Sequence, residues 1–143
     1  MIRNIFIPVF ILTLICVPCY SQNTDLKTLI DTGHYTEAEA AARKSGAHHE
    51  LAEVLAITGR YPEAIKEFEQ AAKDATPKQA LESELRRAEL LELTGQEAQA
   101  RSIYESFLKY YTENNPQTAA ELTLIARALV HLDRFQDAND LYR

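Results

Sequence analysis

Apolar residues recur along residues 22–143 at the spacing that places them on one face of an α-helix, and no stretch alternates apolar and polar residues as a strand does. Residues of high helix propensity fill most positions, and Pro62, Pro77 and Pro116 fall between the periodic segments. We expect these prolines in first turns, where a helix does not use the missing N–H. The pattern predicts four pairs of helices, at residues 23–32 and 36–44, 46–58 and 62–74, 78–94 and 97–112, and 117–132 and 135–143.

Two of the predicted helix starts carry side chains with capping-box spacing. Thr36 is followed three residues later by Glu39, and Thr76 is followed by Gln79. In a capping box the two side chains accept hydrogen bonds from amides that the first helical turn leaves unpaired. We therefore expect these residues to define the starts of two helices.

A short phrase recurs where the two helices of each pair meet. Its clearest copy reads T-G-R-Y-P-E-A-I at residues 58–65, and weaker copies begin at Thr32, Thr94 and Leu132. A reversal between helices needs a residue with positive φ, which glycine adopts without steric cost. The predicted turn residues, which are 26, 36 and 38 residues apart, are Gly33, Gly59, Gly95 and Asp133. Such a period is typical of stacked helical repeats.

These helix–turn–helix units resemble the tetratricopeptide repeat (TPR) family. The second copy carries Leu51, Ala52, Leu55, Gly59, Tyr61, Ala64, Phe68 and Ala71 at the family's positions. The third copy keeps Ala88, Leu91, Gly95, Ala100, Tyr104 and Phe107, and the fourth keeps Ile125, Ala126, Leu129, Phe135, Ala138 and Tyr142. The resemblance implies an all-α fold, a TPR-like α–α superhelix that forms a right-handed solenoid. Residues 22–143 would then hold about four TPR-like repeats, of which the first is short and the last truncated.

The first 21 residues have the features of a secretory signal peptide. Arg3 provides a positive start, residues 5–17 form an apolar run, and small residues precede a cut expected between Ser21 and Gln22. This run of thirteen residues is shorter than the about 20 needed to cross a bilayer. The sequence therefore predicts an exported protein, periplasmic or secreted, with a membrane tether through an uncleaved leader as the alternative.

Both cysteines, Cys16 and Cys19, lie in this leader, so we expect the mature chain to be stabilised by packing without disulfides. Beyond Ser21 the chain has 14 Lys and Arg residues and 21 Asp and Glu residues, a formal net charge of −7. An acidic surface repels nucleic acid backbones and anionic lipid surfaces. We therefore expect no nucleic acid partner and, after signal removal, no membrane partner.

The resemblance also implies a binding surface, because first helices line the concave face of the solenoid in that family. Carried over by position, the residues expected to contact a partner are His49, Glu53, Ile57, Leu85, Glu89, Glu92, Leu93 and Arg127. Our hypothesis is that the three glutamates favour a protein or peptide with a basic segment, and that the three aliphatic residues add apolar contact. The alternative is a solvated helix face, on which i,i+4 pairs such as Glu82 with Arg86 only support the helix. The same spacing relates Glu69 to Lys73.

His48, His49 and Glu50 are the residues nearest to a metal-site pattern. The segment H-E-L-A-E at residues 49–53 lacks the second histidine of the metalloprotease pattern H-E-x-x-H. His48 falls at a large-residue position of its repeat, so we expect it to be packed or half-exposed. No glycine-rich phosphate loop, serine elbow or cysteine nucleophile occurs beyond the leader. We expect no catalytic residue, no metal and no cofactor, and so no enzyme.

We expect Leu141 and Tyr142 to be partly uncovered, because an array of repeats exposes at its end the face meant for the next repeat. Either the chain is the amino-terminal part of a longer protein, or this open C-terminal end docks a second copy of the chain or another protein. The expected function is an exported scaffold for protein–protein interaction through a concave helical groove. The alternative is the N-terminal docking or regulatory part of a larger exported enzyme, whose catalytic domain is not in this chain.

Overall fold

The computed structural model describes residues 25–73, 75–116 and 118–142. These residues form eight α-helices and no strand. The helices are α1 (Leu26–Asp31), α2 (Tyr35–Ser45), α3 (His48–Ile57), α4 (Tyr61–Lys73), α5 (Pro77–Leu93), α6 (Glu97–Asn114), α7 (Ala119–His131) and α8 (Phe135–Asp140). Each helix predicted from the apolar pattern is present, and the expected all-α fold class is confirmed. The predicted signal peptide and its two cysteines lie outside the described residues.

The four turns inside the helix pairs share one backbone geometry. Gly33, Gly59, Gly95 and Asp133 have positive φ values of 80°, 79°, 77° and 59°. In each turn the amide of the following residue donates to a carbonyl five residues earlier, over 2.8 to 2.9 Å. This hydrogen bond satisfies a carbonyl that the helix end leaves unpaired. The predicted turn residues are therefore confirmed.

Thr76 and Gln79 form the predicted capping box at the start of α5. The backbone N–H of Thr76 donates to Oε1 of Gln79 over 3.3 Å. The same prediction for Thr36 and Glu39 is wrong, because α2 begins one residue earlier, at Tyr35. Thr36 therefore lies inside the first turn, and the carboxylate of Glu39 accepts hydrogen bonds from two arginines instead.

Two of the three prolines lie in first turns, as predicted. Pro77 is the first residue of α5, and Pro62 is the second residue of α4. Pro116 lies outside α7, because Thr118 is the N-cap of that helix and its hydroxyl accepts the N–H of Glu121 over 3.3 Å. A polar cap that follows the proline therefore sets the start of α7.

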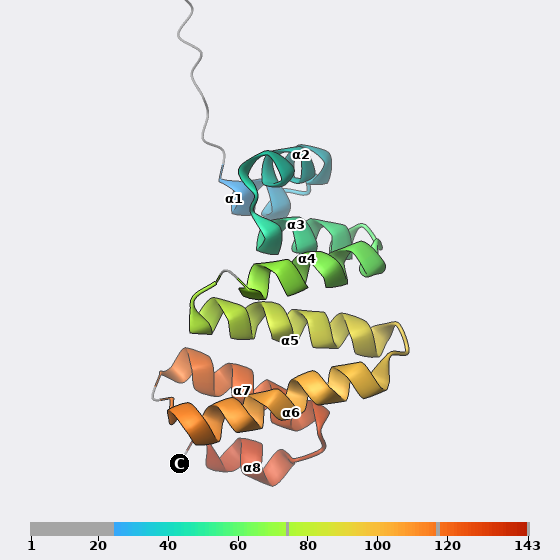
Figure 1. The fold of residues 1–143 in the computed structure, drawn as a ribbon. Coiled ribbons are helices and arrows are strands. Elements are labelled where there is room, and N and C mark those ends of the chain that lie inside the picture. Colours follow the sequence, from blue (N-terminus) through green and yellow to red (C-terminus); the bar gives the residue numbers. More distant parts are fainter. Residues whose placement is uncertain (1–24, 74, 117, 143) are drawn as a thin grey trace, which may run out of the picture.

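The helix pairs stack in chain order along one axis, from α1 and α2 at one end to α7 and α8 at the other (Figure 1). Each helix packs against the next one in the chain, and α5 also touches α7, which aligns the first helices of the repeats. Two buried clusters run through the stack, one around Phe68 and one around Tyr104 and Phe107. Ile65 packs against both clusters, so they form one continuous seam. This arrangement is a TPR-like helical solenoid.

Candidate functional site

The first helices α3, α5 and α7 carry a row of alternating charges, Glu53, Arg86, Glu89 and Arg127, which we call the charge ladder. Arg86 donates to Glu53 from Nε over 2.8 Å and from Nη2 over 3.1 Å, so this pair is bidentate. Its Nη1 donates to one oxygen of Glu89 over 2.8 Å, and Arg127 donates to the other oxygen. The charge ladder therefore joins three consecutive repeats, and the charges of both carboxylates are matched within the protein.

The register of the repeats produces the charge ladder. Glu53, Glu89 and Arg127 each lie six residues before the turn residue of their own repeat. Stacking of the repeats brings such equivalent positions to one side of the solenoid, and Arg86 reaches two of them because it lies one turn before Glu89. Hydrogen bonding to Glu53 raises the pKa of Arg86 above its ordinary value, against the opposing effect of partial burial.

The predicted pair between Glu82 and Arg86 is wrong. Glu82 pairs with Lys78 over 3.4 Å, while Arg86 reaches across to α3. A bidentate arginine–carboxylate pair is stronger than a single contact on an exposed helix face, which explains why Arg86 pairs with Glu53 and not with Glu82. The second predicted pair is confirmed, because Nζ of Lys73 lies 3.2 Å from the carboxylate of Glu69.

Glu92 belongs to a cluster of polar side chains at the turn end of α5. Its Oε2 accepts a hydrogen bond from the hydroxyl of Tyr104 over 3.0 Å and lies 2.9 Å from Nδ1 of His131. The rings of Tyr104 and His131 stack, with centroids 4.6 Å apart and planes inclined by 7°. Burial, and then the bond to Glu92, raises the pKa of Tyr104, so the hydroxyl stays protonated and donates. The Glu92 side chain is 46% exposed, which leaves it accessible to a partner.

The three aliphatic residues predicted to contact a partner do not share one environment. Leu85 is fully buried in the core, because α6 and α7 cover this part of α5, so the expected contact with a partner is wrong for this residue. Ile57 and Leu93 are 49% and 65% exposed. Each lies two residues before its turn glycine, so the two occupy equivalent places in consecutive repeats.

His49 lies between neighbouring helices of the stack. Its Nδ1 is 2.9 Å from Oγ of Ser83 in α5, and its ring meets that of Phe68 in α4 edge-on, with centroids 5.5 Å apart. Ser83 is buried, and this contact satisfies its hydroxyl. His48 lies 2.7 Å from the carboxylate of Glu67 and is partly exposed, in agreement with the role expected for it. The contacts of His49 therefore serve the packing of α3 against α4 and α5.

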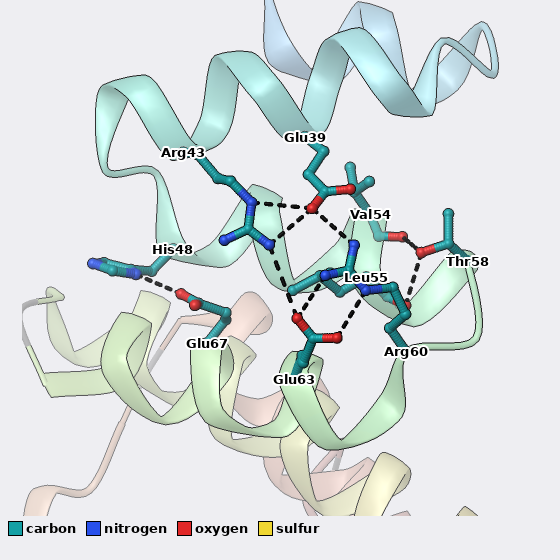
Figure 2. A network of polar contacts seen from close by, with 9 residues as sticks. All are labelled: Glu39, Arg43, His48, Val54, Leu55, Thr58, Arg60, Glu63 and Glu67. Carbon is teal, nitrogen blue, oxygen red and sulfur yellow. Dashed lines mark hydrogen bonds and ion pairs between the residues drawn. The ribbon is translucent and has the colours of Figure 1, made fainter.

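A second polar network, which the sequence did not predict, joins α2 to the turn between α3 and α4 (Figure 2). Oε1 of Glu39 accepts hydrogen bonds over 2.8 Å from both Arg43 and Arg60. Arg60 also donates to Glu63 over 2.8 and 2.6 Å. The hydrogen bonds from Arg43 and then Arg60 lower the pKa of Glu39 below its ordinary value. The i,i+4 spacing of Glu39 and Arg43 indicates the contact between these two residues. The contact of Arg60 with Glu39 has no such local signal, because the two residues are 21 positions apart in the chain.

In residues 25–73, 75–116 and 118–142, no three or more His, Cys, Asp or Glu side chains are grouped so that they could hold a metal ion. Among the helices of these residues, none has the length and apolar character required to traverse a lipid bilayer.

A family model described as tetratricopeptide repeat matches residues 45–70, which include α3 and most of α4. The match falls on the repeat that keeps most of the family's positions, and it supports a tetratricopeptide repeat protein. Comparisons with curated proteins and with solved structures found no match. A tetratricopeptide repeat suggests a scaffold for protein–protein interaction, and an all-helical fold of this kind is typically non-catalytic.

Proposed function

We propose that this protein is an exported scaffold that binds a partner protein through the inner face of α3, α5 and α7. The observation that carries the proposal is the exposure of two large aliphatic side chains, Ile57 and Leu93, at equivalent places on consecutive first helices. The charge ladder beside them holds these helices together before any partner arrives. A surface that is ordered in advance loses little conformational entropy on binding.

The partner segment has both apolar and basic character. Aliphatic side chains of the partner pack on Ile57 and Leu93, and one Lys or Arg binds Glu92, which adjoins Leu93. Glu92 is the best carboxylate for this role, because Glu53 and Glu89 are already held by arginines. The sequence led us to expect a basic segment in the partner, and we now propose that one Lys or Arg of that segment makes the charged contact.

Site-directed crosslinking in the cells that make the protein tests this surface. A photoreactive residue at position 57 or 93 is expected to capture the same partner, whereas one at the exposed Ser102 of α6 captures none. In the purified complex, Glu92→Lys weakens binding by roughly tenfold, as expected for reversal of one contacting charge. Glu113→Lys, which makes the same charge change at the end of α6, is the matched control. Capture from Ser102 alone, or equal effects of the two reversals, would contradict the proposal.

Export is supported by the order of charge, apolar run and small residues in residues 1–21. N-terminal sequencing of the natural protein from the envelope or the medium is expected to begin at Gln22. An intact leader in the membrane fraction would instead identify a membrane tether. Full-length protein confined to the cytoplasm would contradict export.

A further inference from the structure

The solenoid repeats one packing arrangement, in which the first helix of each repeat covers the repeat before it. In the second repeat four residues are covered. Ala52 and Ala56 lie seven and three residues before the turn glycine, and Ala64 and Phe68 lie five and nine residues after it. Leu90 of α5 belongs to the same buried cluster, and Phe68 is 0% exposed. One aliphatic side chain of the covering helix thus packs with three alanines and an aromatic ring.

The third repeat is covered at its alanines and its aromatic ring, whereas the side chain of Glu92 is 46% exposed. The equivalent residues are Ala88, Glu92, Ala100 and Tyr104. Ala128 of α7 shares the buried cluster of this surface, and His131 of α7 stacks on the ring of Tyr104. Tyr104 is 2% exposed as a result. The aromatic ring at this position is therefore buried wherever a following helix lies over it.

The equivalent residues of the fourth repeat, which we call the terminal seat, are Ala126, Val130, Ala138 and Tyr142. Tyr142 is 61% exposed, whereas the equivalent Phe68 and Tyr104 are 0% and 2% exposed, so no part of the chain that the structure describes covers Tyr142 as α5 and α7 cover the earlier aromatic rings. Val130 beside it is 46% exposed. The terminal seat lines a hollow of about 560 Å³ between α7 and α8. Its residue types are those on which a helix packs elsewhere in this molecule.

The charge that faces a covering helix is reversed in the fourth repeat. In the second and third repeats the residue six before the turn is a glutamate, and the covering helix binds it through Arg86 or Arg127. The equivalent residue of the fourth repeat is Arg127 itself, which lines the hollow and is 49% exposed. Arg86 shows that one arginine in this row can hold two carboxylates at once. A helix that covers the terminal seat therefore lies against Arg127, which can bind a second carboxylate besides Glu89.

We propose that the terminal seat docks an amphipathic α-helix of a partner protein that carries a Glu or Asp one turn before an aliphatic residue. The template is α5, in which Arg86 binds the preceding repeat and Leu90, four residues later, enters its apolar surface. In the proposed complex the charges are exchanged: the partner helix supplies the carboxylate, which binds Arg127, and the aliphatic side chain of the partner packs on the terminal seat. This site is separate from the surface around Ile57, Leu93 and Glu92.

A second copy of the chain fits the terminal seat poorly. Head-to-tail packing would bring α1 onto it, and α1 has the exposed, polar Thr28 where α3, α5 and α7 have the buried Val54, Leu90 and Ala128. Tail-to-tail packing about a two-fold axis would bring each terminal seat against the other. The two Arg127 side chains would then approach each other without a new carboxylate. A helix that carries the complementary carboxylate therefore fits the terminal seat better than either arrangement of two copies.

Two fluorescent peptides test the proposal by anisotropy titration against the full chain. One has the α5 sequence of residues 77–93, and the other has the same sequence with Arg86→Glu. We expect the Arg86→Glu peptide to bind about tenfold more tightly, because only it places a carboxylate four residues before Leu90, the register in which α5 packs on the preceding repeat. In a chain with Arg127→Met the two peptides are expected to bind equally. Tyr142→Ser weakens both, whereas Phe135→Ser, which alters an exposed aromatic residue of α8 away from the hollow, changes neither.

Circular dichroism melts of each variant separate loss of binding from loss of folding, and Tyr142 is exposed enough that its replacement leaves the core intact. Equal binding of the two peptides to the unaltered chain would overturn the proposal, as would no binding of either peptide. Sedimentation equilibrium supplies the third outcome. A dimer of the chain that is lost with Tyr142→Ser and kept with Phe135→Ser would assign the terminal seat to a second copy and overturn the proposal.

Discussion

At the residue scale, a single backbone angle decides how each repeat reverses direction. The three glycine turns and the turn at Asp133 have nearly the same φ, between 59° and 80°. A β-carbon at any of these glycines would meet nothing within 4 Å, so the cost of a side chain there is conformational and not a matter of space. Asp133 has this conformational cost, because a residue with a β-carbon is strained at positive φ. Asparagine and aspartate adopt this region more often than other L-residues do.

Two reciprocal substitutions test this explanation. Gly95→Ala is expected to lower the free energy of unfolding by about 1 kcal/mol, since alanine is strained at a φ of 77°. Asp133→Gly is expected to raise it by about 0.5 kcal/mol, because relief of strain exceeds the entropy that glycine adds to the unfolded chain. Urea denaturation measures both changes. A loss of stability with Asp133→Gly would show that the aspartate side chain stabilises the turn in another way.

At the element scale, a short helix is held in the stack by charges that come from two repeats. Glu39 of α2 accepts hydrogen bonds from Arg43 of the same helix and from Arg60 of the following turn (Figure 2). The only buried side chains of α2 are the alanines Ala38 and Ala42, so its apolar contribution is small. The polar network therefore supplies a larger share of the attachment here than in α5 or α6.

The pH dependence of stability follows from the pKa of Glu39, which is lower in the folded protein than its ordinary value of 4.5. The folded state holds the ionised form more strongly, so this contribution is fully present above about pH 4.5 and is lost as the pH falls through the folded-state pKa. At pH 7 we expect Glu39→Gln to lower the free energy of unfolding by up to about 1 kcal/mol. The difference from the unaltered protein shrinks below pH 4.5. Thermal melts across this range measure it, with Glu37→Gln as the control, and a difference that does not change with pH would contradict the network.

At the scale of the whole molecule, the charge ladder links repeats whose apolar contacts reach only their nearest neighbours. Glu53 belongs to α3, Arg86 and Glu89 to α5, and Arg127 to α7. Four side chains thus connect the first helices of three consecutive repeats. Repeat proteins gain their cooperativity from such interfaces between repeats.

Removal of the central cation is expected to weaken this coupling. Arg86→Met keeps a long side chain but leaves Glu53 without its bidentate partner, and we expect a loss of about 1–2 kcal/mol in the free energy of unfolding, reduced by high salt. Arg101→Met removes an arginine from an exposed pair with Glu105 on α6 and is expected to cost less than about 0.5 kcal/mol. Urea denaturation at two salt concentrations measures both. Equal losses for the two variants would show that the charge ladder adds nothing beyond an ordinary surface pair.

The helices and their turns could be predicted from the sequence because they depend on local chemistry. Apolar periodicity, the glycines and the capping pair of Thr76 and Gln79 act within a few residues, so no tertiary contact is needed to read them. Thr36 and Glu39 do not form a capping box, because α2 begins at Tyr35 and Glu39 accepts hydrogen bonds from Arg43 and from Arg60 of the following turn. Arg60 lies 21 residues away from Glu39 in the chain, and nothing in the local pattern indicates the contact.

In the candidate site, too, some features follow from local sequence and others from tertiary contacts. Sequence alone determined that the chain is a stack of helical repeats and that Glu53, Glu89 and Arg127 occupy equivalent positions in it. The tertiary structure alone decided that Arg86 joins Glu53 instead of Glu82, and that Leu85 is buried while Leu93 is exposed. The physical reason is that periodicity defines which face of a helix a residue occupies, whereas the neighbours that cover that face come from distant parts of the chain.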